Sequence, residues 1–497
     1  MYEEENHRTK EEEMEENEPK VGLWDFMWAP FNWLKMLSTE IHWSFVLGVI
    51  LVYGVSQGVG GSLYRVGTEY YMKDVQKVQP SEAQIYQGIT SIPWMVKPLW
   101  GLMTDVIPLL GYRRRPYFIF AGILGIISML FISLHEKLHI FLAVLSLTAG
   151  STGVAIADVT VDACVAQSSN KHQHLAADMQ SLCSLSSATG SLLGFFFSGL
   201  LVHLIGPKGV YGLLIVPFAF VVLVGIILNE PQTVNFSYSQ VSQKFLDATK
   251  AMWHALKLPH IWRPCLYMYL SLALSFNVYE GMFYWYTDSD AGPHFSQEFV
   301  GYILSIGSAG ALLGSMLYQY TLKDHDFRSL CFWTQLCLGL SGMLDLMLVL
   351  RMNLWIGIPD HFFAVLDECA SQLITKLKWM PLLVLSAKLC PPGIEGTFFA
   401  LLMSIDNVGT STSSWFGGIL LHVLNITRTR FENLWIAILI RNIARICPLL
   451  AIFLVPNTDS NSAILPSTLP STEEDSAETP QPENLELVSL VTSADSR

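Results

Sequence analysis

The sequence has few charged side chains for its length. Lys, Arg, Asp and Glu make up 14% of its 497 residues, whereas an average soluble domain carries about 25%. Hydrophobic residues make up 51% of the chain. This scarcity of charge excludes an ordinary soluble protein and predicts a chain that crosses a membrane many times.

Several chemical signatures are also missing. The sequence has no GxxxxGK[ST] motif to cradle the phosphates of ATP, so pumping by ATP hydrolysis is not indicated. Its eight cysteines lack CxxC spacing and lie mostly in apolar stretches, which favours small buried side chains over disulfides or metal ligands. Neither a Ser–His–Asp arrangement nor metal-ligand spacing stands out. The sequence therefore predicts no enzyme, no cofactor and no metal site.

The net charge of −13 resides in the two ends of the chain. Residues 1–20 carry −6 and residues 457–497 carry −7, so the remainder is close to neutral. Acidic ends with few aromatic residues predict solvated disorder and no nucleic-acid partner. The N-terminus is too acidic for a signal or transit peptide. The Trp-rich stretch 21–37 suits an interfacial anchor, or a long entry to the first span.

Apolar stretches of about 20 residues can cross a bilayer core, and we count twelve such stretches. They lie at 43–64, 83–104, 116–134, 138–163, 176–204, 210–229, 264–286, 297–320, 329–350, 357–386, 397–422 and 433–455. The predicted fold is an all-α polytopic membrane protein with twelve transmembrane helices. Its predicted parts are a disordered and interfacial N-terminus (1–42), two six-helix halves (43–229 and 264–456), a central cytoplasmic loop (230–263) and a disordered tail (457–497).

The two predicted halves resemble each other in sequence. Residues 180–204 align with 399–423, which superposes Gly190 on Gly409, Phe197 on Phe416, Gly199 on Gly418 and His203 on His422. A second alignment superposes Gln84 on Gln297, Gly88 on Gly301, Gly101 on Gly314 and Arg115 on Arg328. A parallel duplication of six spans places a substrate site between the halves, near the middle of the bilayer.

The loop after the second predicted span combines a glycine, an acid and three arginines. Gly101 permits close helix approach, and Asp105 requires a basic or helix-N-terminal partner. The three arginines (Arg113, Arg114 and Arg115) can bind headgroups or pair with acids when an inner gate closes. The alternative is that they only fix topology. Together with a slight excess of basic residues in the loops on the same side, they predict cytoplasmic termini.

This loop resembles the signature loop of the major facilitator superfamily. The stretches "VKPLWGLMTDVIPLLGYRRRPY", "ADVTVDACVAQ", "KWMPLLVLSAKLCPPGIEGTFFALLMSI" and "LIRNIARICPL" are similar to the folate–biopterin transporter family, particularly its plant branch. The resemblance covers roughly residues 43–456. It implies transport of folates or pterins, often proton-linked, in a plasma or internal membrane. We expect a monomer in the lipid bilayer, with a small-molecule substrate as its other partner.

Ionisable side chains inside the predicted spans mark candidate functional sites, because burying a charge in a bilayer is costly. At about 1.5 Å per residue, depth matches Lys97 with Asp158, and Arg445 with Asp406. Asp158 is the leading candidate for proton coupling, with Lys97 as its partner. For both pairs, the alternative is that the charges neutralise each other and fix helix packing.

Two further charges receive different predictions. Asp162 lies one turn from Asp158, level with Asp105 and the arginines, which suggests an inner-gate partner. A solvated helix end is the alternative reading. Arg441 lies one turn from Arg445 but has no acid assigned to it.

Folate carries two carboxylates on its tail, so a buried cation is expected to bind it, and its pterin ring suits aromatic faces and a carboxylate or amide. Lys376 is the leading cation. The other predicted contacts are Glu368, Gln372, Glu280, Tyr284, Tyr64 and Arg65. The alternative for Tyr284 is the aromatic belt at the membrane surface.

The predicted function is alternating-access transport of folates or pterins, driven by a proton or other gradient. Two alternatives remain open: a transporter of another organic anion or metabolite, and a non-transporting receptor or scaffold on the same fold.

Overall fold

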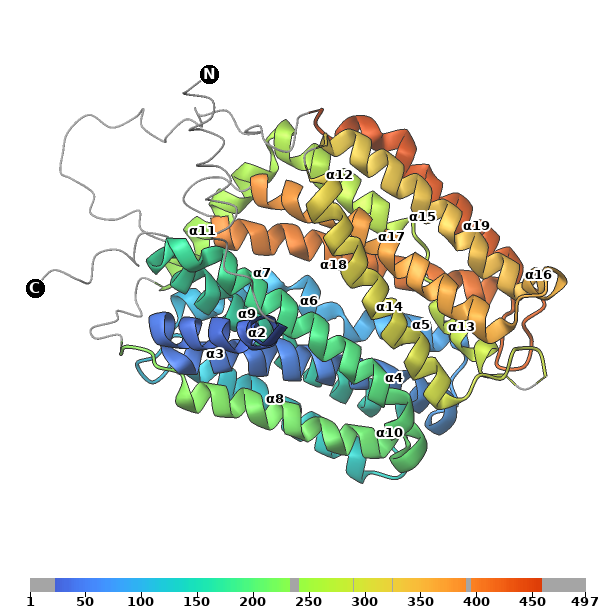
Figure 1. Ribbon diagram of the computed structural model, residues 1–497, viewed down its shortest axis with the longest axis horizontal. Coiled ribbons are helices and arrows are strands. Elements are labelled where there is room, and N and C mark those ends of the chain that lie inside the picture. Colours follow the sequence, from blue (N-terminus) through green and yellow to red (C-terminus); the bar gives the residue numbers. More distant parts are fainter. Residues whose placement is uncertain (1–22, 233–240, 289, 324, 390–394, 458–497) are drawn as a thin grey trace, which may run out of the picture. The chain divides into compact units, whose positions relative to one another are not determined.

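The computed structural model describes residues 23–457 except 233–240, 289, 324 and 390–394, and regular structure in these residues is helical apart from one isolated bridge (Figure 1). The longer elements of the first half are α2 (Leu23–Leu37), α3 (Trp43–Val49), η2 (Ile50–Gly60), α4 (Gly61–Tyr70), η3 (Tyr71–Val75), α5 (Pro80–Thr90), α6 (Ile92–Met95), α7 (Lys97–Val106), α8 (Arg115–Leu134), α9 (Ile140–Lys171) and α10 (Ala176–Ile227). Those that follow are α11 (Val241–Leu256), α12 (Pro259–Ala273), α13 (Tyr279–Tyr286), α14 (Gln297–Leu317), η6 (Tyr318–Leu322), α15 (Phe327–Val349), α16 (Met352–Trp355), α17 (Asp360–Lys388), α18 (Glu395–Val423), α19 (Leu434–Ile446) and η7 (Cys447–Leu454).

The chain divides into two compact units, Met1–Leu47 and Gly48–Arg497. In the first unit, α2 exposes the apolar side chains of Trp28 and Phe31, the kind of surface that an interfacial helix requires. The second unit contains nearly all of both predicted six-helix halves. The domain boundaries proposed above remain a prediction.

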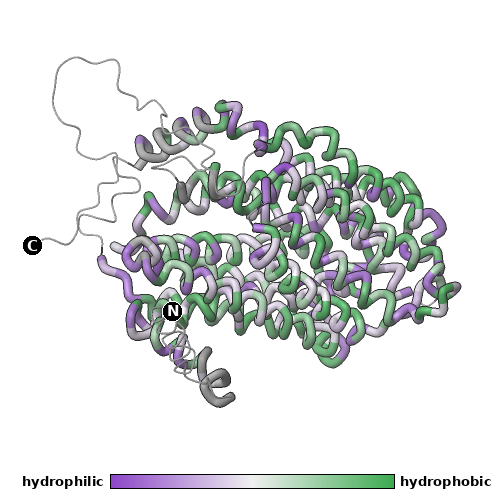
Figure 2. Tube along the Cα trace, turned by 45° about the horizontal axis from the view of Figure 1, so that its top comes forward, coloured by the Kyte–Doolittle hydropathy of each residue, from purple (hydrophilic) through white to green (hydrophobic). Residues whose placement is uncertain are grey.

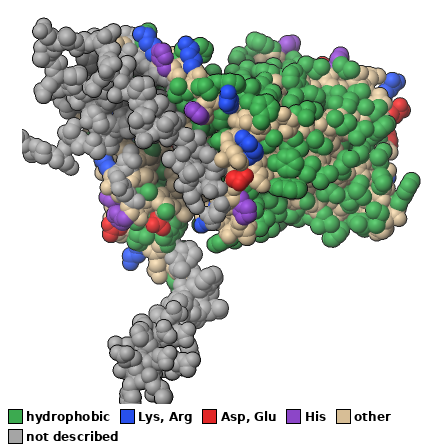
Figure 3. Space-filling view, turned by 90° about the horizontal axis from the view of Figure 1, so that it is seen from above, with side chains coloured by type: hydrophobic (Ala, Val, Ile, Leu, Met, Phe, Trp, Pro, Cys, Tyr) green, Lys and Arg blue, Asp and Glu red, His purple; other side chains and the backbone are tan. Residues whose placement is uncertain are grey.

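Seven helical segments in the described part of the chain are long and apolar enough to cross a membrane. One of the seven, α10, contains two of the predicted spans, because the chain turns at Gly206 with φ of 72°. The other four of the twelve predicted spans are too short or too polar to be among the seven. Two are interrupted helices (α5–α7 and α12–α13), and two are long but polar helices (α17 and α18). In Figure 2 hydrophobic residues dominate along most of the helices. Figure 3 shows hydrophobic side chains over a broad area of one face, with charged side chains toward its ends.

The second span is interrupted by prolines. Pro93 and Pro98 stand in the first turns of α6 and α7, where a residue without an N–H is tolerated but cannot continue the preceding helix. The interruption leaves backbone carbonyls for α18 to bind. Asn407 Nδ2 donates to the Trp94 carbonyl at 3.1 Å, and Ser404 Oγ donates to the Met95 carbonyl.

The seventh span is interrupted in a similar way between α12 and α13. Phe276 adopts a φ of 36°, and the Asn277 N–H donates to both the carbonyl and the hydroxyl of Ser413 on α18, each at 3.0 Å. A Cβ on Gly417 would lie 1.7 Å from the Asn277 carbonyl oxygen. A glycine in α18 is therefore required for this interruption to pack against it.

Three of the repeated glycines, Gly199, Gly301 and Gly418, lie where the two halves meet. A Cβ on Gly199 of α10 would approach the Gln297 carbonyl oxygen of α14 to 2.0 Å, and one on Gly301 would lie 2.9 Å from the Gly199 nitrogen. On the other side, a Cβ on Gly418 of α18 would lie 2.9 Å from the Ser81 carbonyl oxygen of α5. We call these two contacts, α10 with α14 and α18 with α5, the seams. They relate equivalent helices, as expected for a parallel duplication.

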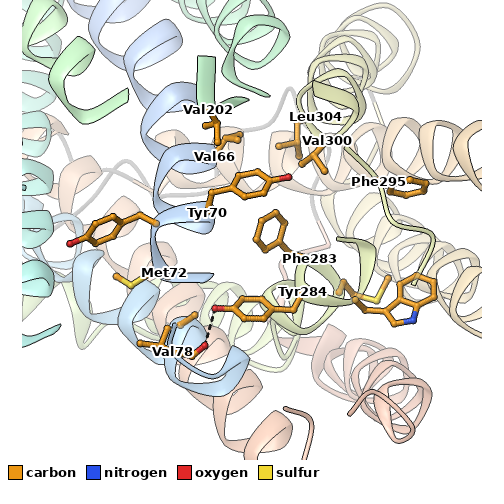
Figure 4. Close-up of a cluster of buried hydrophobic side chains, with 14 of the residues drawn as sticks. Val66, Tyr70, Met72, Val78, Val202, Phe283, Tyr284, Phe295, Val300 and Leu304 are labelled. Carbon is orange, nitrogen blue, oxygen red and sulfur yellow. Dashed lines mark hydrogen bonds between the residues drawn. The ribbon is translucent and has the colours of Figure 1, made fainter. Parts of the chain in front are cut away.

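Buried aromatic residues fill the bundle near the end that carries the η3–α5 and α13–α14 connections, which we call the far end. Tyr70 of α4 and Phe283 of α13 meet edge to face with ring centroids 5.0 Å apart, and the Tyr284 hydroxyl donates to the Val78 carbonyl at 3.1 Å (Figure 4). All three rings are almost fully buried. These contacts join the two halves at the far end.

Several boundaries differ from those predicted, and the fourth span, for example, continues to Lys171 rather than ending at residue 163. The first span does not end near residue 64 but continues as helix to Val75, so Arg65 lies within the span rather than in a loop. Arg65 is tolerated there because it contacts Glu69 and the ring of Tyr279. The seventh span begins at Pro259 rather than at residue 264, since a proline is well tolerated in a first helical turn.

The seams predict that Gly199→Ala is destabilising. Its Cβ would collide with a backbone carbonyl, and overpacking of this kind costs about 1–3 kcal/mol. Thermal unfolding of the detergent-solubilised protein should show a lowered Tm. Gly61→Ala is the matched control, because a Cβ at this helical glycine meets no described atom within 4 Å. Equal Tm values for both variants would contradict the tight seam.

Candidate functional site

Glycines also hold the first and fifth spans in backbone contact. A Cβ on Gly190 of α10 would lie 2.1 Å from the Gly54 carbonyl oxygen, and one on Gly58 would lie 2.7 Å from Gly190 Cα. Small residues allow this approach. The contact fixes the helical stretch that carries Tyr53 and Gln57.

These two side chains reach a cluster around Lys97, which we call the Lys97 cluster. Lys97 Nζ lies 2.5 Å from Asp158 Oδ2 and 3.3 Å from Asp162 Oδ2. Gln57 Nε2 donates to Asp158 Oδ1 at 2.8 Å, and the Tyr53 hydroxyl donates to Asp162. One lysine thus serves two carboxylates.

The position of Lys97 explains why two acids are needed. It is the first residue of α7, where the helix dipole disfavours a cation. Asp158 is 6% exposed and holds Lys97 from α9. The Asp162 side chain is 49% exposed, so one carboxylate of the cluster remains accessible. The structure brings Lys97 and Asp158 together as the depth comparison predicts.

The arginine loop is organised by two acids. Arg114 Nη2 lies 2.6 Å from Asp105 Oδ1. The carboxylate of Glu230 accepts hydrogen bonds of 2.7–3.1 Å from the backbone N–H groups of Arg113, Arg114 and Arg115. Asp162, predicted to pair with these arginines, contacts Lys97 and Tyr53 instead. Its helix face is turned toward the first and second spans.

Gly101 faces α9, where an added Cβ would lie 3.4 Å from Val159 Cγ1 and so make an ordinary packing contact. A Cβ on its counterpart Gly314 would lie 2.6 Å from the Leu373 carbonyl oxygen of α17. The repeat therefore relates the α7–α9 contact to the α14–α17 contact.

A second cluster, the Arg65 cluster, joins both halves. Arg65 Nε donates to Glu69 Oε1 at 3.2 Å, and its guanidinium lies 4.8 Å from the ring centroid of Tyr279 on α13 and 5.7 Å from that of Phe195 on α10. Glu368 of α17 acts on Arg65 electrostatically. The Glu69 side chain is 3% exposed, whereas that of Arg65 is 35% exposed. A guanidinium with accessible surface among several acids and aromatic rings can accept an anionic group.

Glu280 extends this cluster toward the second span. It is almost fully buried, acts electrostatically with Glu69 and Arg65, and its backbone N–H donates to Gln84 Oε1 at 3.0 Å. Gln84 Nε2 in turn donates to Gln87 Oε1 at 2.7 Å. Carboxylate and amide groups from both halves are thereby placed close together.

The predicted polar stripe of α17 lies beside α14. Gln372 Nε2 donates to Glu368 Oε1 at 2.8 Å, and Gly307 leaves room for both side chains. Lys376 is half-buried, with its Nζ 4.3 Å from the ring centroid of Trp379. Among the ion pairs of the described residues, none involves Lys376.

Two aromatic candidates lie apart from these polar groups. Tyr64 packs within the first half, against the ring of Tyr211 on α10 at 6.5 Å between centroids, because successive residues of a helix point about 100° apart. Tyr284 is buried in the far-end aromatic layer rather than in a belt at the membrane surface. Neither contacts the Arg65 guanidinium.

The intramembrane arginines have an acid that the sequence did not identify. Arg441 Nη2 lies 2.6 Å from Asp345 Oδ2 of α15, and Arg445 acts electrostatically with Asp345 and Asp367 rather than with Asp406. The expected pairing of Arg445 with Asp406 is therefore corrected. Equal depth did not identify the partner, because the helix face decides which side chains meet.

Lys378 of α17 is the charged neighbour that acts electrostatically on Asp406. Lys378 Nζ donates to the Ser271 carbonyl of α12 at 2.8 Å. Both Asp406 and Lys378 are buried.

Several residues of these clusters escaped sequence reasoning, namely Tyr53, Gln57, Glu69, Glu230, Asp345, Asp367 and Lys378. Glu69 could have been found from its i,i+4 spacing to Arg65 once the first span was extended. Asp345 lies within the ninth predicted span and Lys378 within the tenth, and an ionisable residue inside a span is a detectable signal. Glu230 ends the sixth span, and nothing in its local sequence indicates that it binds a distant loop.

Comparison with known proteins places this arrangement in a family. Residues 57–468 match the model of the BT1 family. The chain belongs to the BT1 family. It is 62% identical over 471 residues to "Probable folate-biopterin transporter 2" of Arabidopsis thaliana, with 94% of each chain covered. It is 32% identical to "Folate-biopterin transporter" of Synechocystis sp., covering 85% of this chain and 84% of the relative.

The BT1 chain also shares its fold with solved transporters. The crystal structure of a D-xylose–proton symporter matches with a TM-score of 0.58 at 15% identity, covering 84% of this chain and 98% of the other. The predicted major facilitator superfamily fold and the resemblance to folate–biopterin transporters are confirmed. This BT1 member is an integral membrane transport protein and not an enzyme.

The Arg441–Asp345 contact predicts that Arg441→Met removes the nearest cation from the half-buried Asp345 carboxylate. Breaking a buried ion pair in this way costs about 3–5 kcal/mol, measurable as a lowered Tm of the purified protein. Arg430→Met is the control, because Arg430 is exposed. The double variant Arg441→Met with Asp345→Leu should recover part of the loss, and no recovery would argue against a pairwise interaction.

Proposed function

We propose that this BT1 member moves folates or pterins across a membrane by alternating access, coupled to protons. The observation that carries the proposal is its 62% identity, over 94% of both chains, to a relative named a probable folate–biopterin transporter. The Arg65 cluster supports it, because charged and aromatic side chains of both halves converge there.

The chemistry of the substrate suits these residues. The two carboxylates of a folate tail require cations, which Arg65 and Lys376 supply. The pterin ring presents donors and acceptors along one edge and a flat face. Glu280, Glu368 and Gln372 offer partners for the edge, and Tyr279 offers an aromatic face. Tyr64 and Tyr284 serve this binding indirectly, by packing the helices that carry Arg65 and Glu280.

The conformation described is consistent with one state of an alternating-access cycle. The far-end aromatic layer and the Gly199 and Gly418 contacts close one end of the bundle, while Asp162 toward the other end remains accessible. Rocking the halves about the seams opens the far end and closes the opposite end. In this proposal the loop of Asp105 and the three arginines is the inner gate and faces the cytoplasm, as do both termini, and the transporter works as a monomer.

The Lys97 cluster is the proposed coupling site of the first half. A proton arriving at Asp158 or Asp162 would leave Lys97 with a single carboxylate and weaken the link between α7 and α9. That change connects protonation to the position of the second span, which forms part of a seam.

Uptake of labelled folate, pteroate and biopterin by purified protein in liposomes tests the substrate. We expect all three to enter, and faster uptake when an inward proton gradient is imposed. Absence of uptake for every folate and pterin would refute this substrate class, and would favour another organic anion or, with retained binding, a receptor. Uptake unchanged by the gradient in wild type and in Asp158→Asn would refute the coupling role of Asp158.

Lys376→Met tests how the substrate is oriented. Folate has two tail carboxylates, pteroate has one and biopterin has none, so losing a tail-binding cation should raise KM for folate most and for biopterin least. Losing one charge-assisted contact is expected to change KM by about tenfold, as a loss of roughly 1.5 kcal/mol implies. Lys323→Met, an exposed lysine, serves as control. Equal effects on all three substrates would contradict tail recognition by Lys376.

A further inference from the structure

Asp406 of α18 is an unusual buried acid. The residue is 7% exposed, and neither of its carboxylate oxygens accepts a hydrogen bond from the described protein groups. Among the other buried acids, Glu69, Glu280 and Asp367 each have only one oxygen without a partner, and both oxygens of Asp158 are held, one by Lys97 and one by Gln57. Asp406 is thus the only described acid whose two oxygens are both buried and unpartnered.

An ionised carboxylate in such a place would be strongly unfavourable, because a buried charge needs a close opposite charge and hydrogen bonds. The neutral acid avoids most of this cost. The surroundings of Asp158 differ, because that carboxylate has a lysine at 2.5 Å and an amide donor at 2.8 Å.

The charged surroundings of Asp406 consist of one nearby lysine. Lys378 of α17 is the titratable group that acts on Asp406 electrostatically. Among the described residues, no titratable side chain of the other helices that pack on α18, namely α5, α6, α12 and α19, acts on Asp406 in this way. Arg445 of α19 and Cys331 of α15 act on Lys378. Lys97 of α7 is held by Asp158 and Asp162. Lys378 donates to the Ser271 carbonyl and does not form an ion pair with Asp406 within 4.0 Å.

We propose that Asp406 carries a proton in this conformation, and that Lys378 receives its carboxylate once the proton leaves. The proton passes to water, and the new carboxylate replaces the Ser271 carbonyl as the partner of the Lys378 ammonium. Asp406 and Lys378 together form a protonation site in the second half, separate from the Lys97 cluster of the first.

The neighbours of Asp406 give this site a connection to the other half. Ser404 and Asn407 on the same helix bind the carbonyls of Met95 and Trp94, just before Lys97. The Trp94 ring centroid also lies 5.7 Å from Lys97 Nζ. A shift of α18 toward α17 on proton release therefore acts on the interruption of the second span. This link to transport rests on the proposed function, whereas the protonation of Asp406 does not.

Infrared spectroscopy of the purified full-length protein, without substrate, tests the protonation directly. A protonated carboxylic acid has a carbonyl stretch that an ionised one lacks. At neutral pH, Asp406→Asn should remove one such band, whereas Asp360→Asn, which removes an acid held by Arg351 at 2.6 Å, should not. In Lys378→Met the band should persist to higher pH, because the cation that favours ionisation is gone.

Asp406→Glu guards against misfolding as an explanation and should retain a carbonyl band. A spectrum of Asp406→Asn identical to that of the wild type would overturn the protonation of Asp406. A band that titrates equally in wild type and Lys378→Met would overturn the role of Lys378.

Transport measurements test the link between the two halves. In liposomes, Asp406→Asn should keep exchange of folate across the membrane but lose the acceleration by a proton gradient. Gradient-driven accumulation equal to wild type would overturn the coupling role. If wild type transports no folate or pterin, the proposed function fails while the infrared result still decides the protonation state.

Discussion

A charge inside the helix bundle is tolerated only where another group compensates it, and much of the structure follows from this constraint. Lys97 is shared by two aspartates, Arg65 contacts Glu69 and two aromatic rings, and Arg441 contacts Asp345. Each of these cations links helices that are distant in sequence, Arg65 through its two aromatic contacts. The polar side chains therefore determine which helix faces meet, while the apolar majority is satisfied by any buried or lipid-facing position.

Glycines make these pairings geometrically possible. Gly54, Gly58 and Gly190 let the first and fifth spans approach closely, which positions Tyr53 and Gln57 to donate to the two aspartates of the Lys97 cluster. The same device recurs at both seams. The halves are thus held together by backbone contacts at one end, and by side-chain hydrogen bonds to the interrupted second span along α18.

The sequence predicted the helical class, the spans and the repeat, because hydrophobic length and glycine spacing are local signals. It also predicted Lys97 with Asp158, whose depths and facing helices both agree. It failed for Arg445 with Asp406, where depth agrees but Lys378 is the neighbour that acts on Asp406 electrostatically. Asp162 was assigned to the arginine loop on depth alone, and the rotation of α9 directs it to Lys97 instead. Which face of a helix meets which neighbour depends on packing that is specified by many distant residues together.

The ion pair of Arg441 has a consequence for the order in which the protein is made. Asp345 precedes Arg441 by 96 residues, and α19 is the last of the membrane spans. Asp345 and Asp367 therefore enter the membrane before either arginine has been synthesised. A chain that stops short of α19 leaves Asp345 and Asp367 without the two guanidinium groups that act on them. Synthesis of α19 thus supplies the cations that these acids lack. The Arg441–Asp345 ion pair therefore forms only in a second half that includes α19.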